Sequence, residues 1–269
     1  MSNLQISVIG FPLDENSSFM RGPANAPDVI RKNLESYSIN LCAENGVDFR
    51  NNPCWSDVGN VELTTGSDAM DQIEESIRGL LDKGIKPLSL GGDHSVIFPI
   101  IKAFAEKYEK LNIFHIDAHP DLYDNFEDNP YSHASPFARI MENRLVNKLV
   151  QVGIRTINPA QQTQIDKFDV EVHDMINFDS SMNFDFDGPV YISIDLDGLD
   201  PAFAPGVSHH EPGGLTTRQA LEMIQNLDYE IVGADIVEYN PDRDINDMTA
   251  MVCVKLLKEL LAKMRNRST

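Results

Sequence analysis

Short apolar runs alternate with amphipathic helical stretches from one end of this chain to the other. Six apolar runs of strand length predict β-strands: Leu4–Ile9, Pro87–Leu90, Asn112–Ile116, Leu149–Val152, Val190–Ile194 and Ile231–Ile236. Apolar positions recur at helical spacing in five further segments: Ala69–Leu81, Val96–Tyr108, Pro136–Asn143, Thr217–Leu227 and Met248–Met264. Strands that alternate with helices in this way form a parallel sheet covered by helices on both faces. The pattern therefore predicts an α/β fold.

The alternation continues without an internal repeat, a low-complexity run or a Ser/Gly linker. A length of 269 residues suits one large α/β domain, and a hydrophobic content of 42% is enough to bury a substantial core. We therefore expect residues 1–269 to form a single domain.

The chain is strongly acidic, with a formal net charge of −20 at pH 7. Such a charge repels nucleic acid and anionic membranes, so neither is an expected partner. It suits a small cationic substrate.

The cysteine content and the N-terminal sequence both bear on the compartment. Cys42, Cys54 and Cys253 are three widely separated cysteines without a CxxC pair, which is typical of a reducing environment. The first residues, MSNLQISVIGFPLD, predict an early strand and lack the features of a targeting leader, and no run reaches the length of a membrane span. We expect a soluble cytoplasmic protein.

Four of the predicted strands run directly into polar segments. These segments are Gly91–Ser95 (GGDHS), Asp117–Asp121 (DAHPD), Asp195–Pro201 (DLDGLDP) and Glu238–Pro241 (EYNP). In open α/β sheets, ligands bind just beyond the carboxyl ends of the strands. The four segments are therefore expected to meet at one site.

Carboxylates and imidazoles dominate these segments. They supply six candidate metal ligands: His94, Asp117, His119, Asp121, Asp195 and Asp197. Residues two apart project to one side while a chain stays extended, and unpaired carboxylates crowded together would be costly to desolvate. Six ligands suit two metals that share bridging carboxylates. A ligand set in which carboxylate oxygens outnumber imidazole nitrogens favours Mn²⁺, with Co²⁺, Ni²⁺ and Zn²⁺ as alternatives. Two metals ~3.5–4 Å apart can generate a nucleophile from water at neutral pH. Asp93 and Asp200 are instead expected to cap a helix or a turn.

At this point the motifs show a family resemblance. GGDHS, DAHPD and SIDLDGLDPAFAPG are similar to the signatures of the ureohydrolase family, which contains arginases and agmatinases. The likeness begins at NSSFMRGPANAP, and YSHASPFARIME, QVGIR, GVSHHEPGGL and VGADIVEYNPDRD most resemble arginases of the plant type. The resemblance implies a three-layer α/β/α fold with an eight-stranded parallel sheet, a pair of Mn²⁺ ions, and a homotrimer or homohexamer.

The resemblance also implies roles for individual residues. The six candidate ligands match the family's metal ligands, with Asp117 and Asp195 expected to bridge. His133 falls where the family has its proton-shuttle histidine, with a helix cap as the alternative. Glu238 falls where a glutamate pairs with the substrate guanidinium, with a structural salt bridge as the alternative. Asp121 is expected to pass a proton to the departing amine.

The walls of the substrate pocket are less well determined by sequence. Asn158 occupies the position at which many animal arginases have an aspartate that contacts the substrate α-amino group. His209 and His210 are expected to border the pocket, with a position at its rim as the alternative for one of them. His115 lies on the strand face of Asp117, but the family pattern does not use it, so we expect a buried supporting role. His173 has no motif around it.

These residues are compatible with more than one function. The leading hypothesis is an arginase, which converts L-arginine and water to L-ornithine and urea. Its close alternative is an agmatinase, which converts agmatine to putrescine and urea, or another guanidino- or formimino-acid hydrolase. A two-metal phosphoesterase would need basic residues near the site to neutralise phosphate, and the metal motifs contain none. The remote alternative is a non-catalytic binding or regulatory subunit.

Overall fold

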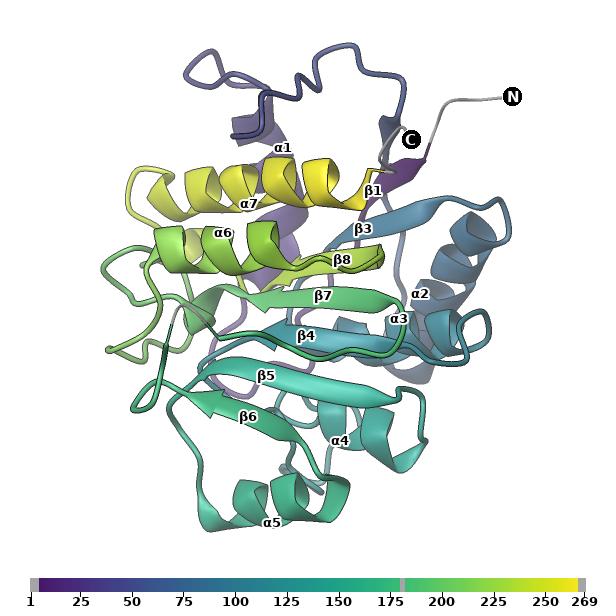
Figure 1. The fold of residues 1–269 in the computed structure, drawn as a ribbon, viewed down its shortest axis with the longest axis vertical. Helices are drawn as coiled ribbons and strands as arrows, with labels where there is room; N and C mark the ends of the chain where they lie inside the picture. The colour runs from purple at the N-terminus through teal and green to yellow at the C-terminus, as the bar shows by residue number, and fades with distance from the viewer. Residues whose placement is uncertain (1–4, 180–181, 266–269) are drawn as a thin grey trace.

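The computed structural model describes residues 5–179 and 182–265, and Figure 1 shows a central sheet between two layers of helices. The strands are β1 (Ile6–Gly10), β2 (Trp55–Asn60), β3 (Lys86–Leu90), β4 (Asn112–Ile116), β5 (Lys148–Ile154), β6 (Glu171–Asp174), β7 (Val190–Asp195) and β8 (Ile231–Val237). The α-helices are α1 (Ala26–Leu34), α2 (Gly66–Leu81), α3 (Ile97–Ala105), α4 (Pro136–Glu142), α5 (Pro159–Phe168), α6 (Thr217–Asn226) and α7 (Met248–Met264).

The eight strands form one sheet in the order β2-β1-β3-β8-β7-β4-β5-β6, and every neighbouring pair is parallel. Because all strands run the same way, their carboxyl ends lie along a single edge of the sheet. This strand order places β3, β8, β7 and β4 side by side at the centre of the sheet. The predicted α/β fold with an eight-stranded parallel sheet is therefore confirmed.

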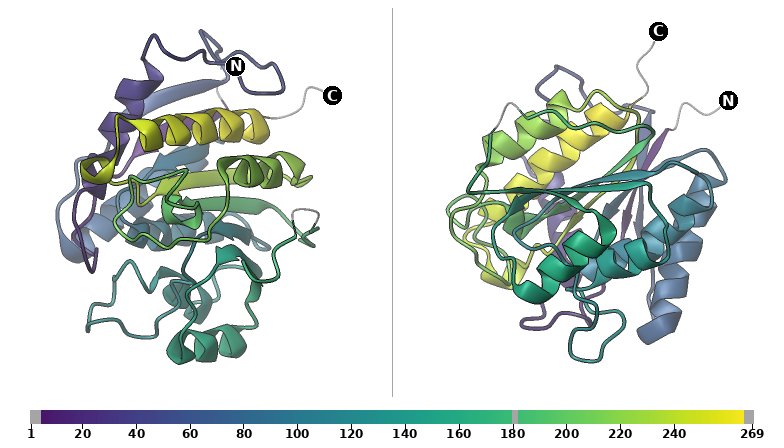
Figure 2. Two further views of the ribbon diagram at one scale, coloured as in Figure 1. Left: turned by 90° about the vertical axis from the view of Figure 1, so that its left-hand side faces the viewer. Right: turned by 60° about the horizontal axis from the view of Figure 1, so that its bottom comes forward.

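Helices cover both faces of this sheet, as Figures 1 and 2 show. Helices α1, α6 and α7 lie on one face and α2, α3 and α4 on the other. Successive side chains of the central strands point to opposite faces, so that Ile113 belongs to one apolar core and Phe114 to the other. Burial on both faces explains why the central strands are predominantly apolar.

All the predicted elements recur: Asn112–Ile116 and Met248–Met264 have the predicted ends, and the others have shifted ends. Four strands and helices escaped prediction. The unpredicted strands, β2 and β6, are the two edges of the sheet. Their sequences, WSDVGN and EVHD, are mostly polar and only partly buried. The unpredicted helices are α1 and α5. Leu4, the first residue of the first predicted strand, lies outside the described residues.

Local capping sets helix boundaries next to the sheet. Thr216 and Gln219 form a reciprocal capping box at the start of α6, which satisfies backbone amides that the helix itself leaves unpaired.

Within residues 5–179 and 182–265, no helix combines the length and the apolar character needed to cross a bilayer.

Candidate metal centre

The polar segments that follow the four central strands meet at the carboxyl edge of the sheet. His94 follows β3, Asp117 follows β4, Asp195 ends β7 and Glu238 follows β8. All four side chains are buried. The structure thus brings together the segments that the sequence predicts to form one site.

The six candidate ligands fall into two groups that share Asp117. Ligand atoms of His94, Asp117, Asp121 and Asp195 lie within 4.8 Å of one another, and so do those of Asp117, His119 and Asp197. Asp117 presents Oδ2 to His94 Nδ1 at 3.3 Å and Oδ1 to His119 Nδ1 at 3.4 Å. A bridging carboxylate has this arrangement, with one oxygen directed at each of the two ligand groups.

Asp195 does not have this symmetrical placement. Its Oδ2 lies 3.2 Å from His94 Nδ1 in the first group, while its Oδ1 accepts a hydrogen bond from the Asp197 amide. The expected bridging role of Asp195 stays a prediction.

Tight backbone geometry, rather than an extended strand, brings the ligands together. Strand β4 ends at Ile116, before the first ligand, and Asp121 adopts a left-handed conformation with a φ of 49°. The Asp197 side chain accepts a hydrogen bond from the Ala118 amide, which connects the Asp195–Pro201 segment to the Asp117–Asp121 segment. Gly198 is required there, because a Cβ would lie 2.8 Å from the Asp117 nitrogen. The expectation that Asp117, His119 and Asp121 share one side of an extended chain had the wrong physical basis.

His94 offers the clearest test of whether these groups fit a metal. Its Nδ1 atom is buried without a hydrogen bond of acceptable geometry, although Asp121 Oδ2, Asp195 Oδ2 and Asp117 Oδ2 lie 3.0, 3.2 and 3.3 Å away. Neighbouring ligands of one octahedral ion with bonds of about 2.1 Å lie about 3.0 Å apart. The four atoms therefore have the spacing of ligands that converge on a common cation.

The other ring nitrogen of His94 supports the same assignment. Ser193 Oγ donates to the Asp235 carboxylate, so His94 Nε2, which lies 3.0 Å from that Oγ, must be the donor to it. The lone pair of a neutral ring is then on Nδ1, facing the carboxylates. Burial acts to lower the pKa of His94, but Asp117, Asp121 and Asp195 outweigh it and raise the pKa well above its usual value. The site favours positive charge at this point.

The carboxylates show the complementary effect. Burial raises the pKa of Asp195 well above its usual range, and the negative charges of Asp197 and Asp117 add to the increase. Burial, followed by the charge of Asp117, raises the pKa of Asp121 to about 6. A divalent cation between these groups would offset both the burial of the carboxylates and their mutual repulsion, so the residues fit a metal pair.

Glu238, His133 and Ser18 form a hydrogen-bonded chain beside the two groups. Glu238 Oε1 accepts hydrogen bonds from the His94 amide (2.9 Å) and from His133 Nδ1 (2.8 Å). His133 Nε2 accepts from the Ser18 amide at 3.1 Å and lies 2.8 Å from Ser18 Oγ. Burial acts to lower the pKa of His133, but Glu238 and other carboxylates raise it to about 9. His133 therefore links Glu238 to an exposed hydroxyl.

Sequence reasoning missed Ser18, because nothing in the NSSFMRGP segment shows that it packs against a histidine 115 residues away. By contrast, Asp93 accepts a hydrogen bond from the Ser95 amide at the start of the His94–Val96 helical turn. Asp200 accepts amide hydrogen bonds from Ala202, Gly213 and Gly214. Both aspartates thus have the capping role expected of them.

A cavity of about 390 Å³ opens over the candidate ligands. Its base includes His119, Asp121, Asp195, Asp197, His133 and Glu238, and its wall includes Ser18, Tyr123, Phe126, Thr156, Asn158 and His209. A larger cavity of about 650 Å³ lies around Lys86 and Ile231, at the opposite ends of β3 and β8, and none of the candidate ligands lines it. The smaller cavity is the one that a substrate of the metal centre would enter.

The structure places the remaining candidates as follows. Asn158 lines the cavity and caps α5, because its Oδ1 accepts from the Gln161 amide. His209 lines the cavity between the rings of Phe19 and His133, with centroid distances of 5.5 and 5.6 Å. His210 is exposed and donates to the Pro205 carbonyl, whereas His173 pairs with Glu171 on the edge strand β6.

The chain is similar to known proteins over nearly all of its length. The model of the arginase family matches residues 4–262. Arginase 1, mitochondrial, of Arabidopsis thaliana is 46% identical over 275 residues, which cover 96% of this chain and 80% of that protein. The solved structure of arginase from Medicago truncatula is 44% identical with a TM-score of 0.92, covering 97% of this chain and 88% of that chain. An agmatinase of Bacillus anthracis is 34% identical over 96% of this chain and 91% of its own length.

Proposed function

This chain belongs to the arginase family of hydrolases, and on that premise we propose that it hydrolyses L-arginine to L-ornithine and urea at a pair of Mn²⁺ ions. One observation carries the proposal: the two ligand groups share the buried Asp117 and adjoin a cavity that Glu238 and His133 also line. The higher identity to plant arginases than to the bacterial agmatinase favours arginine as the substrate.

Six side chains would hold the metals. His94 and Asp121 would bind one ion, His119 and Asp197 the other, and Asp117 and Asp195 would bridge them. Four carboxylates and two imidazoles are a predominantly hard ligand set, which supports Mn²⁺. When bound, the pair would supply Lewis acidity and a nucleophile at neutral pH.

The chain itself would bind the guanidinium and move protons. Both hydrogen bonds to Glu238 described above are accepted by Oε1, so Oε2 remains for a guanidinium N–H. The Asp121 carboxylate, at the base of the cavity, would carry a proton to the departing amine nitrogen. His133 would exchange protons with solvent through Nε2, which faces the exposed Ser18. Asn158 and His209 would contact the amino-acid end of the substrate.

The substrate assignment predicts the outcome of a direct assay. The metal-free protein is reconstituted with Mn²⁺, and urea release is measured from L-arginine and agmatine in parallel. We expect kcat/KM for arginine to exceed that for agmatine by at least about tenfold, since a lost polar contact of 1.4 kcal/mol has that effect. A preference for agmatine would leave the metal chemistry intact and replace the substrate. No urea from either compound, with two ions bound, would contradict the proposed reaction.

Metal binding should also stabilise the fold, because the ligands lie on three different segments and three of the carboxylates carry raised pKa values. A ligand at about 100 times its dissociation constant stabilises by about 2.7 kcal/mol. For a chain of this size we therefore expect Mn²⁺ to raise the unfolding temperature of the metal-free protein by about 5–10 °C. Mg²⁺ at the same concentration serves as the control for ionic strength. An unchanged unfolding temperature at saturating Mn²⁺ would argue against this centre.

The proposal includes a homotrimer or homohexamer located in the cytoplasm. Ile245, Met248 and Phe203 are exposed apolar side chains that assembly could cover. The three cysteines are free thiols, which supports a reducing compartment.

A further inference from the structure

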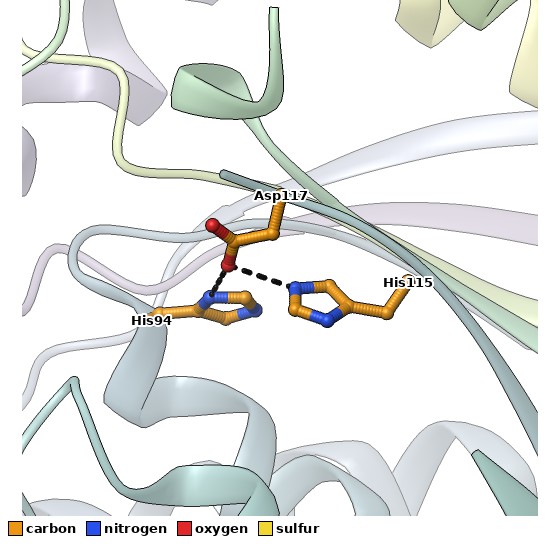
Figure 3. A group of neighbouring side chains, drawn as sticks. All are labelled: His94, His115 and Asp117. Atoms are coloured by element: carbon orange, nitrogen blue, oxygen red, sulfur yellow. Dashed lines mark hydrogen bonds and ion pairs between the residues drawn. The ribbon is translucent and has the colours of Figure 1, made fainter. Parts of the chain in front are cut away.

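A buried row of hydrogen bonds runs from the DAHPD loop through Gln151 and His115 to Asp117. Gln151 Nε2 lies 2.7 Å from the Pro120 carbonyl oxygen and 3.0 Å from His115 Nδ1. His115 Nε2 lies 2.9 Å from Asp117 Oδ2, and Figure 3 shows the ring turned toward that carboxylate. His115 and Gln151 are paired residues of β4 and β5, and all three side chains are fully buried.

The Pro120 carbonyl determines the direction of every bond in this row. A carbonyl oxygen only accepts, so the Gln151 atom that faces it must be the amide nitrogen. The second hydrogen of the same nitrogen is then directed at His115 Nδ1, which must accept it. The ring proton is left on Nε2, where it is donated to Asp117 Oδ2. His115 is therefore a neutral donor, and the Pro120 carbonyl of the DAHPD segment fixes its tautomer through Gln151.

We propose that Gln151 and His115 are positioning residues for the bridging carboxylate, and that His115 is not itself a metal ligand. The inference rests on the metal centre proposed above. Each oxygen of Asp117 accepts one fixed hydrogen bond, Oδ2 from His115 and Oδ1 from the His119 amide. Each oxygen keeps a second lone pair, which a carboxylate shared by two ions requires.

His115 could otherwise be taken for a ligand. His94, His115 and Asp117 lie close enough together to hold a metal, and Figure 3 shows the three side chains around one point. That arrangement needs a lone pair on His115 Nε2, whereas the row of hydrogen bonds places a proton there.

The two roles predict opposite responses to Gln151→Glu. A glutamate carboxylate can only accept a hydrogen bond, so the His115 ring proton would move to Nδ1. Nε2 would then present a lone pair to Asp117 Oδ2. If His115 positions Asp117, Mn²⁺ affinity should fall by about 10–100-fold. If His115 were a metal ligand, a carboxylate that accepts a hydrogen bond from Nδ1 would make Nε2 more basic, and Mn²⁺ affinity would rise.

The measurement is a titration of the metal-free protein with Mn²⁺, with free Mn²⁺ followed by electron paramagnetic resonance. Gln164→Glu is the matched control: it makes the same chemical change at another buried glutamine, which pairs with Lys167 on α5. Its affinity should stay within about twofold of the wild type. Unchanged or tighter binding in Gln151→Glu would overturn the proposal. A wild type that binds no Mn²⁺ would overturn the metal centre as well.

A second pair of variants decides the question if Gln151→Glu does not fold. His115→Gln can keep an N–H donor near the place of Nε2, whereas His115→Met donates nothing. We expect His115→Gln to retain Mn²⁺ affinity within a few-fold of the wild type and His115→Met to lose about 10–100-fold. An equal loss in both variants would contradict a positioning role.

Discussion

Asp117→Asn is expected to lower kcat for urea release by at least about 10³-fold and to prevent binding of the second Mn²⁺ ion. Metal pairs contribute several kcal/mol to transition-state stabilisation, and each 1.36 kcal/mol corresponds to a factor of ten. An asparagine can present only one oxygen, so it cannot serve both groups. If its oxygen stays toward the His119 amide, its NH₂ group faces the His115 Nε2–H donor, which opposes binding further.

Asp195→Asn should also abolish activity, but the two variants should differ in the stability of the metal-free protein. Burial raises the pKa of Asp195 well above its unfolded value, so ionisation destabilises the fold as the pH rises above the unfolded pKa. A neutral asparagine removes this cost at pH 7 and should raise the unfolding temperature. The pKa of Asp117 is held well below its usual value despite burial, chiefly by His115. Its ionised form stabilises the fold, so Asp117→Asn should lower the unfolding temperature.

The experiment compares metal content, turnover and thermal unfolding of both variants. Asp71→Asn, at an exposed position on α2, is the control and should leave all three unchanged. Full turnover with two ions bound in Asp117→Asn would show that this carboxylate does not bridge the metals. The same result in Asp195→Asn would remove its bridging assignment alone.

The sequence predicts the centre of this molecule better than its periphery, for a physical reason. Central strands such as β4 are buried on both faces and read as apolar runs, whereas β2 and β6 pair on one side only and keep polar residues. Their sequences carry no strand signal strong enough to separate them from loops. The six candidate ligands were predictable because each follows or ends a central strand.

Contacts between distant segments were not predictable in the same way. The pairing of Gln151 with His115 depends on the register of β5 against β4, and Ser18 reaches His133 across 115 residues. Asp121 and Glu238 take left-handed backbone conformations, with φ of 49° and 60°. Such conformations are uncommon outside glycine and are held by surrounding structure, so composition alone does not reveal them.

Glu238→Gln is expected to reduce kcat/KM for arginine by about 10²- to 10³-fold while two Mn²⁺ ions remain bound. Truncating one partner of a buried, hydrogen-bonded charge pair costs about 2–5 kcal/mol, or about 30- to 5,000-fold, and the expected loss lies in the middle of that range. The loss should appear largely in KM, because Glu238 is proposed to bind the guanidinium and is not one of the proposed ligands. Loss of metal together with activity would show instead that Glu238 supports the centre through the His94 amide.

His133→Asn separates the two contacts of that histidine and completes the argument about Glu238. An asparagine amide can replace Nδ1 as a donor to Glu238, but nothing replaces Nε2, which faces Ser18. We expect kcat to fall by about 10²-fold with little change in KM, since proton transfer by a positioned group contributes at least that much. Glu238 and His133 are in contact, so the double variant should lose less than the product of the two single losses. Losses that multiply fully would show that the two residues act independently, and that the Glu238–His133 contact is structural alone.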